Sequence, residues 1–320
     1  MPRFDLSIGV LLVLAGMHGW SGQTAVSGHT SEVRVVSFLA DGRTLLSGAA
    51  DYTIRLWDVP DGRSRGIWQR VPEFDAAAST TVISVSPAAG LIARAGAEQG
   101  TAEIWDIAKT ARVRTIRAHA RVVDAVALSR GGSLLVTATA DEVRTWDVAA
   151  GKALARVTAP NLYRIGGIAA APDGKTIAVA ATDRTLVLYD AVSGKPLVQY
   201  QGVPGQVKSL DFSPDGKLLA SGQEAPAEDS VRIWDVSQAA AVQHVAGPPN
   251  QASAVAFSPD GRLLASAERI VMVWDVEART PTHSFTGHTA PVRSLAFSPD
   301  GALLASAADD RVIALWTIQK

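Results

Sequence analysis

The sequence predicts an all-β fold, a seven-bladed β-propeller whose blades are four-stranded antiparallel sheets. Two observations carry this prediction. Three segments nearly superimpose, namely FSPDGKLLAS (212–221), FSPDGRLLAS (257–266) and FSPDGALLAS (297–306). In addition, an aromatic residue, usually followed by Asp, recurs at the end of successive β-runs. A repeat of about 40 residues built from short strands is typical of a propeller.

The recurring aromatic residue defines the number of units. Its occurrences are Trp57, Trp105, Trp146, Tyr189, Trp234, Trp274 and Trp316. Neighbouring occurrences lie about 40–48 residues apart, so the chain contains seven units of similar length. No segment has a sustained helical period and no linker interrupts the units, so residues 20–320 are predicted to form a single domain.

Each unit contains four predicted strands separated by turns. An apolar run such as VRSLAFS precedes the turn PDG, which places Pro and Gly where a tight turn needs them. A second run, LLAS, and a third run, such as VRIWDV, come next. The turn SGK then introduces a fourth run, PLVQY, in the fourth unit. Four short antiparallel strands make each unit one blade.

The first 19 residues differ from the repeats and are predicted to be a leader. Their apolar run, from Leu6 to Gly16, is about half the length that a membrane-spanning helix needs. It resembles the apolar region of a secretory signal peptide, which predicts an exported protein, periplasmic or extracellular, from a bacterial source. The alternatives are an uncleaved anchor or an upstream strand, and without a signal peptide the protein would be cytoplasmic.

The last unit ends after its third strand, in RVIALWTIQK (311–320), and lacks a fourth. An unpaired edge at the seam of a ring would invite pairing with other chains. Residues 20–27, WSGQTAVS, precede the first unit in the place where a fourth strand precedes every other unit. The N-terminal segment is therefore predicted to complete the last blade and close the ring.

Composition excludes several classes of function. The 30 Lys and Arg residues balance 31 Asp and Glu residues, so no basic face for nucleic acid is predicted. The absence of cysteine excludes disulfides and thiolate chemistry. The chain also lacks a phosphate-binding loop motif and a ligand-spaced metal motif. No cofactor, metal ion, nucleic acid or small-molecule substrate is therefore expected, and no membrane span beyond the possible leader.

Four residue types recur at nearly fixed spacing within three of the units. They are His29, Ser47, Asp51 and Trp57 in the first unit, His119, Thr137, Asp141 and Trp146 in the third, and His288, Ser306, Asp310 and Trp316 in the seventh. With these residues the chain resembles the WD-repeat propeller family over about residues 20–320. The resemblance implies that each set forms a hydrogen-bonded tetrad inside its blade.

The other units depart from that pattern. The second unit has Ala95 and Gln99 at the Ser and Asp positions, and the fourth has Val179 and Tyr189. The fifth keeps Ser221 and Trp234 around an inserted loop, and the sixth keeps Ser266 and Trp274. These departures are expected to affect the rigidity of single blades rather than the fold.

The tetrads also contain the residue types of a hydrolytic triad. A nucleophilic serine must be exposed beside its histidine and an oxyanion hole. Three copies of one constellation, each beside a tryptophan and inside a strand layer, favour a structural role. The sequence therefore predicts a protein that is not an enzyme.

The resemblance implies that partners dock on the face formed by the loops between blades. The residues predicted to contact a partner there are Arg34, Asp124, Tyr163, Arg164, Lys208 and Arg293. Arg34 and Arg293 belong to neighbouring blades of a closed ring and are expected to receive a carboxylate of an extended protein segment. Arginine and tyrosine are frequent anchors of protein interfaces.

The predicted function is therefore a scaffold for protein–protein interaction, with a partner of unknown identity. Two alternatives stay open. One is an exported propeller enzyme, lactonase-like or quinoprotein-like, although the predicted inner strands offer mostly Val, Leu, Ala and Ser rather than converging carboxylates and histidines. The other is a sensor or scaffold subunit of a larger exported complex.

Overall fold

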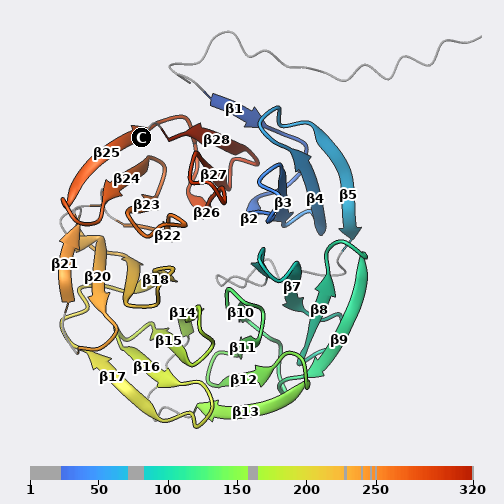
Figure 1. The fold of residues 1–320 in the computed structure, drawn as a ribbon, viewed down its shortest axis with the longest axis vertical. Coiled ribbons are helices and arrows are strands. Elements are labelled where there is room, and N and C mark those ends of the chain that lie inside the picture. The colour runs from blue at the N-terminus through green and yellow to red at the C-terminus, as the bar shows by residue number, and fades with distance from the viewer. Residues whose placement is uncertain are drawn as a thin grey trace, which may run out of the picture.

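The computed structural model describes residues 23–70, 83–157, 165–226, 229–238, 241–245, 247–248 and 251–318. The predicted leader, Tyr163 and Arg164 lie outside these residues. Seven four-stranded antiparallel sheets are arranged around a central axis (Figure 1), which confirms the predicted propeller. In the described part of the chain, no helix is long and apolar enough to cross a membrane.

The blades follow one another along the chain, and in each the first strand faces the centre of the ring and the fourth lies on its circumference (Figure 1). Blades 1 to 3 consist of β2 (Val33–Phe38), β3 (Thr44–Ala49), β4 (Thr53–Asp58) and β5 (Ser64–Arg70); β6 (Ile83–Ser86), β7 (Leu91–Ala95), β8 (Thr101–Asp106) and β9 (Ala111–Arg117); and β10 (Ala125–Leu128), β11 (Leu134–Ala138), β12 (Val143–Asp147) and β13 (Lys152–Val157).

Blades 4 to 7 repeat this arrangement. They consist of β14 (Ile165–Ala170), β15 (Thr176–Ala181), β16 (Leu186–Asp190) and β17 (Pro196–Tyr200); β18 (Val207–Phe212), β19 (Leu218–Gln223), β20 (Val231–Asp235) and β21 (Ala241–Val245); β22 (Ala254–Phe257), β23 (Leu263–Ala267), β24 (Val271–Asp275) and β25 (Thr280–Phe285); and β26 (Val292–Phe297), β27 (Leu303–Ala308) and β28 (Ile313–Thr317) with β1 (Gln23–Val26).

The strand β1 closes the ring, as predicted. It pairs antiparallel with β28, with Gln23 opposite Trp316 and Val26 opposite Ile313. The N-terminal strand therefore completes blade 7, so the hydrogen bonds of one sheet join the two ends of the described chain.

The core lies between blades rather than within one sheet. Every residue of β3 is buried, whereas β5 is largely exposed. Between blades 7 and 1, Phe38, Leu45 and Trp57 pack with Ile313 and Leu315. Complete burial of one such side chain contributes about 1.5–3 kcal/mol, so each blade is stabilised by its neighbours.

The PDG turns have a specific reason to contain glycine. Gly216, Gly261 and Gly301 have φ angles of 73°, 74° and 71°, a region that residues with a side chain rarely occupy. The preceding aspartate fixes the turn: Ser213 Oγ donates to Asp215 Oδ1 at 2.7 Å, and the backbone N–H of Lys217 donates to the same oxygen at 3.1 Å.

Side chains of the inner strands connect neighbouring blades. The backbone N–H of Val36 donates to Ser294 Oγ at 3.2 Å, and that of Phe257 donates to Asp211 Oδ2 at 2.8 Å. Burial raises the pKa of Asp211 to about 6, against the opposing effect of the Phe257 N–H. The ring is therefore held by polar contacts near its axis as well as by apolar packing.

Six of the seven outer strands carry a shift in register against the third strand. These are β5, β9, β13, β17, β21 and β25, whereas the pairing of β1 is regular. A β-bulge twists an exposed edge and discourages pairing with another chain. The circumference is therefore protected on six blades by geometry.

Candidate functional site

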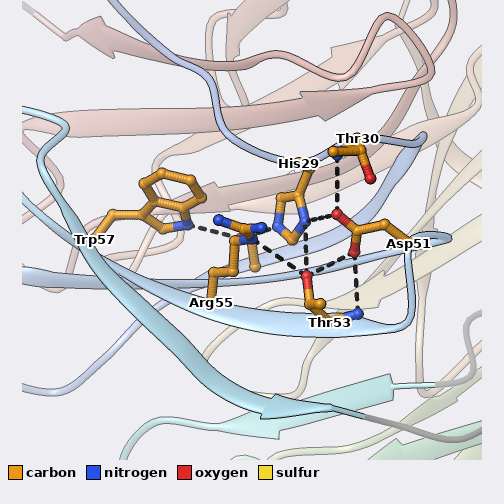
Figure 2. Close-up of polar contacts among 7 residues, drawn as sticks. His29, Thr30, Asp51, Thr53, Arg55 and Trp57 are labelled. Carbon is orange, nitrogen blue, oxygen red and sulfur yellow. Dashed lines mark hydrogen bonds and ion pairs between the residues drawn. The ribbon is translucent and has the colours of Figure 1, made fainter. Parts of the chain in front are cut away.

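The tetrad of blade 1 forms a continuous chain of hydrogen bonds (Figure 2). The indole N–H of Trp57 donates to Ser47 Oγ at 2.7 Å, and that oxygen lies 2.7 Å from His29 Nε2. The other ring nitrogen, His29 Nδ1, lies 2.9 Å from Asp51 Oδ2. The backbone N–H of Thr30 donates to the same carboxylate oxygen at 2.9 Å.

The carboxylate of Asp51 decides where the protons lie. An ionised carboxylate only accepts, so His29 Nδ1 carries the proton and donates it to Asp51. His29 Nε2 then accepts from the Ser47 hydroxyl, and Ser47 Oγ accepts from Trp57. All four side chains are therefore satisfied by a neutral histidine.

The pKa values agree with this arrangement. Burial lowers the pKa of His29, although its bond to Asp51 works in the opposite direction. Burial acts to raise the pKa of Asp51, but hydrogen bonds from Thr53, Thr30 and His29 outweigh it, and the pKa lies below its ordinary value. A neutral histidine beside an ionised aspartate is the consequence.

Blade 7 repeats this geometry. His288 Nδ1 lies 2.9 Å from Asp310 Oδ2, and His288 Nε2 lies 2.7 Å from Ser306 Oγ. The Trp316 indole donates to Ser306 Oγ at 2.8 Å. The structure thus brings together the predicted residues of both blades in the same order.

In blade 3 the predicted acid is replaced by its neighbour. His119 Nε2 lies 2.8 Å from Thr137 Oγ1, which accepts from the Trp146 indole at 2.9 Å. His119 Nδ1, however, lies 2.9 Å from Glu142 Oε2. The assignment of Asp141 to this tetrad is therefore wrong.

The reason is a deletion in the turn between the second and third strands. Blade 3 has one residue fewer between its Thr and its Trp than blade 1 has between Ser47 and Trp57. The turn places Asp141 outward, where its side chain is 60% exposed. The longer side chain of Glu142 reaches back to the histidine, and it also pairs with Arg144 and Arg156.

Blades 5 and 6 keep only part of the tetrad. Trp234 donates to Ser221 Oγ at 2.8 Å, and Ser221 donates to Gln223 Oε1 at 2.7 Å, so a glutamine takes the place of the histidine. In blade 6, Trp274 donates to Ser266 Oγ at 3.0 Å.

Blade 2 uses charge instead. The strand register places Arg94, not Ala95, at the position of Ser47, because Arg94 lies opposite Glu103 as Ser47 lies opposite Arg55. Arg94 and Glu103 form an ion pair of 2.6 Å, and each side chain is 4% exposed. The Trp105 indole donates to Glu103 at 3.0 Å. An arginine inside a predicted apolar strand is the sequence signal for this ion pair, and aligning the repeats by their spacing did not reveal it.

We call the surface formed by the loops between blades and the turns between second and third strands the loop face. Arg34 and Arg293 lie side by side on it. Arg293 Nε donates to both oxygens of Asp309, at 3.0 and 2.9 Å, and Arg34 Nη1 lies 4.0 Å from the same carboxylate. Arg34 also pairs with Glu32. The hydrogen bond from Arg293 to Asp309 raises the pKa of Arg293.

A carboxylate of the chain itself therefore occupies the place predicted for the partner's carboxylate. Lys208 is engaged similarly: its Nζ lies 3.3 Å from Glu224 Oε2 of the inserted loop. Asp124 is half-buried, and its backbone N–H donates to the carbonyl of Ala138 at 2.8 Å. The contact positions of blades 7, 1 and 5 are thus basic and each is paired with an acid of the same chain, whereas the contact position of blade 3 is acidic.

A hollow opens on the loop face where blades 2 and 3 meet. It has a volume of about 650 Å³ and is lined by Glu98, Gln99, Arg117, Ala118, His119, Ala120 and Arg144. His119 itself is 5% exposed, so the accessible polar side chains are the arginines, Glu98 and Gln99.

The buried serines offer no nucleophile, because Ser47 and Ser306 are 0% exposed. Among the described residues, no group of three or more His, Asp or Glu side chains is placed to hold a metal ion. The chemistry that the site supports is recognition by charge and hydrogen bonding.

Comparison with known proteins identifies similar chains. The family model described as "WD domain, G-beta repeat" matches residues 20–58, 194–235, 241–275 and 279–317. The U3 small nucleolar RNA-associated protein 15 homolog of Xenopus tropicalis is 26% identical over 63% of this chain and 38% of its own length. The nuclear distribution protein PAC1 of Arthroderma otae is 27% identical over 68% and 52%, respectively.

A third relative is the pre-mRNA-processing factor 19 homolog 2 of Arabidopsis thaliana, 30% identical over 68% of this chain and 33% of its own. The chain therefore spans between about a third and about half of these proteins. The relatives named for a small nucleolar RNA contradict the expected export and the cytoplasmic alternative, so the predicted localisation is wrong. The predicted bacterial source and signal peptide find no support in these eukaryotic relatives.

Proposed function

Because the chain belongs to the WD-repeat family, we propose that it is a non-enzymatic scaffold that binds an extended segment of a protein partner on the loop face. The observation that carries the proposal is a set of basic side chains on that face, each paired with an acid of the same chain. Blades 7, 1 and 5 present Arg293, Arg34 and Lys208 at the same position of their inner strands, each beside an acid.

Ion pairs that already exist on the loop face can be replaced by ion pairs with a partner protein. A partner carboxylate that approaches Arg34 and Arg293 replaces Asp309, while a partner lysine or arginine is received by Asp309, Glu32 and nearby Glu268. Such pairing contributes mainly to specificity and to the association rate rather than to raw affinity. A segment that carries both signs of charge fits this part of the loop face.

A pull-down from a nuclear extract tests the proposal. The protein with Arg34→Ala and Arg293→Ala is compared with the wild type and with a matched control, Arg43→Ala and Arg262→Ala. The control arginines are exposed in turns after the first strands, at the opposite end of the blades. Loss of specific partners from the loop-face variant alone supports the proposal, and identical partner sets for all three proteins refute it.

The names of two relatives support a nuclear location, which is part of the proposal. The exclusion of nucleic acid is not confirmed, since one relative is named for a small nucleolar RNA. The alternative of an exported propeller enzyme has no support in the relatives, which are named for RNA-associated or nuclear roles.

A further inference from the structure

The charged residues of the outer strands are distributed unevenly around the ring. The outer strands of blades 1, 2 and 3 contain basic residues and no acidic ones: Arg65, Arg70, Arg112, Arg114, Arg117, Lys152 and Arg156. The outer strands of the other four blades contain no Asp, Glu, Lys or Arg. We call the outer strands β5, β9 and β13 the basic rim.

The three strands are consecutive along one arc of the circumference (Figure 1). Some of the basic side chains on these strands form ion pairs with acidic residues of the same chain. Arg65 pairs with Asp58 at 2.5 Å, Arg112 pairs with the buried Glu103 at 2.8 Å, and Arg156 pairs with Glu142.

The accessible charge rests on the remaining residues. Arg70 and Lys152 are exposed, and the side chain of Arg117 is 85% exposed. The ion pair of Arg117 is a long one, 3.9 Å to Glu98, and both side chains lie in solvent, where such a pair contributes little. These cations are available to a ligand at small cost.

Exposed apolar side chains lie on the same three strands as these cations. Ile67, Val113 and Leu154 are 41, 53 and 36% exposed, one on each strand of the basic rim. Val113 and Leu154 each occupy the bulge of their strand, so Val113 stands between Arg112 and Arg114. Each strand thus offers one exposed apolar side chain and at least one exposed cation.

We propose that the basic rim binds an acidic, leucine-containing segment of a protein partner, which places its carboxylates on the arginines and its aliphatic side chains on Ile67, Val113 and Leu154. The inference rests on the proposed scaffold function and adds a second docking surface to it. The hollow between blades 2 and 3 continues this surface onto the loop face, because Arg117 belongs to both.

The composition of the basic rim favours a peptide over nucleic acid. Binding of single strands uses aromatic side chains on which bases stack. The one aromatic residue of the three strands is Trp68, which is half-buried and donates its indole N–H to the carbonyl of Ile107 at 3.2 Å. Exposed aliphatic side chains gain nothing from a phosphate backbone, whereas they match leucine or valine of a peptide.

The test uses the full-length protein and a fluorescein-labelled peptide of alternating Glu and Leu, followed by fluorescence anisotropy. Probes of alternating Lys and Leu, of alternating Glu and Ser, and a single-stranded RNA serve for comparison. Three variants are measured: Arg70→Gln/Arg117→Gln/Lys152→Gln, Val113→Ser/Leu154→Ser, and the matched control Lys175→Gln/Lys195→Gln/Lys217→Gln. The control lysines are exposed residues of blades 4 and 5.

We expect the arginine-containing triple variant to bind the Glu-Leu peptide about tenfold more weakly, and the control to bind it as the wild type does. The aliphatic variant should also lose affinity, and the Glu-Ser peptide should bind more weakly than the Glu-Leu peptide. The inference is overturned by any one of three results: no binding of the peptide to the wild type, equal losses in the triple variant and its control, or RNA binding that exceeds peptide binding and ignores Val113→Ser/Leu154→Ser.

Failure here is distinguishable from failure of the proposed scaffold function. The variants on the basic rim leave Arg34 and Arg293 intact, and the pull-down with the loop-face variant does not involve the rim. A rim that does not bind the peptide, with partners still lost from the loop-face variant, removes this inference alone.

Discussion

Blades 1 and 2 are neighbours and each has a tryptophan at the same position, but the two indole N–H groups find different hydrogen-bond acceptors. In blade 1, Trp57 ends a chain of neutral and ionised groups that runs through Ser47 and His29 to Asp51. In blade 2, Trp105 donates directly to Glu103, which the buried Arg94 neutralises. The indole N–H at this position needs a hydrogen-bond acceptor, and the fold accommodates either a serine hydroxyl or a glutamate carboxylate.

The two arrangements differ in what they require of their surroundings. The serine and histidine of blade 1 are small and neutral and fit a fully buried site, where Trp57 is 1% exposed. The ions of blade 2 need further partners: Arg112 contacts Glu103, and the guanidinium carbons of Arg94 and Arg112 lie 5.4 and 5.8 Å from the Trp105 ring. A buried ion pair is therefore more vulnerable to the loss of one member.

The largest effect is expected for Glu103→Ala, which leaves Arg94 buried without its counter-ion. We expect the free energy of unfolding, measured in urea, to fall by about 3–5 kcal/mol. Arg94→Ser/Glu103→Ala removes the buried cation as well and offers the Trp105 indole a hydroxyl acceptor like that of Ser47, so it should recover part of the loss. Glu98→Ala, at a 79% exposed site, is the control. Equal stability of Glu103→Ala and the control would contradict the ionised arrangement.

A smaller effect is expected for the serine of the tetrads. Ser47→Ala leaves the Trp57 indole and His29 without their shared partner and should cost about 1–3 kcal/mol. Ser266→Ala, in a blade without the histidine, orphans the Trp274 indole and should cost less. Thermal unfolding of both variants, beside Ser284→Ala at an exposed site on β25 of the same blade, measures the difference. A larger loss for Ser266→Ala would show that the histidine adds nothing to the tetrad.

The replacement of Asp141 by Glu142 in blade 3 can be tested directly. Glu142→Ala removes the acceptor of His119 and the partner of Arg144, and should cost about 1–3 kcal/mol. Asp141→Asn keeps an acceptor for the buried Thr139 hydroxyl and should stay within about 0.5 kcal/mol of the wild type. The opposite order in urea unfolding would restore Asp141 to the tetrad.

The smallest effect concerns pH. The pKa of His29 and of His119 is lowered in the fold, chiefly by burial, so the unfolded chain takes up a proton at higher pH than the folded one. The stability from the neutral histidines is present above the ordinary pKa of about 6.5 and is lost as the pH falls below it. The wild type should therefore lose melting temperature relative to His29→Gln/His119→Gln between about pH 7 and pH 5.

The melting temperature of the wild type is compared with that of the histidine variant because Asp211 changes the stability of both proteins with pH in the opposite direction. The pKa of Asp211 is raised to about 6, so its carboxyl destabilises the fold above that pH and less so as it takes up a proton. Both proteins contain Asp211, so its contribution cancels. Parallel melting curves across this pH range would contradict the neutral histidines.

The repeat in the sequence predicted the number of blades, their strands and the closing strand, because turn residues and the recurrent aromatic residues lie at regular intervals. It also predicted which residues meet in blades 1 and 7. It failed in blade 3, where a shortened turn exchanged Asp141 for Glu142, and in blade 2, where the register placed Arg94 at the serine position. Both failures concern turns whose length differs from the repeat.

The electrostatic features were harder to predict. Charges that balance over the whole chain concealed the basic rim, since composition does not say which strand lies outside. The sequence placed Arg34 beside Arg293, but Asp309 comes from a different turn, and its approach to both arginines follows from the folded geometry.

The pairing of β1 with β28 has a mechanical consequence. Gln23 lies opposite Trp316, at the end of the ladder from which the chain leaves on both sides. A force that pulls the flanking segments apart acts across this ladder, so its hydrogen bonds carry the load one after another rather than together. The pairing of β1 with β28 would therefore separate at low force. The other six blades would unfold only after this pairing had broken and the ring had opened.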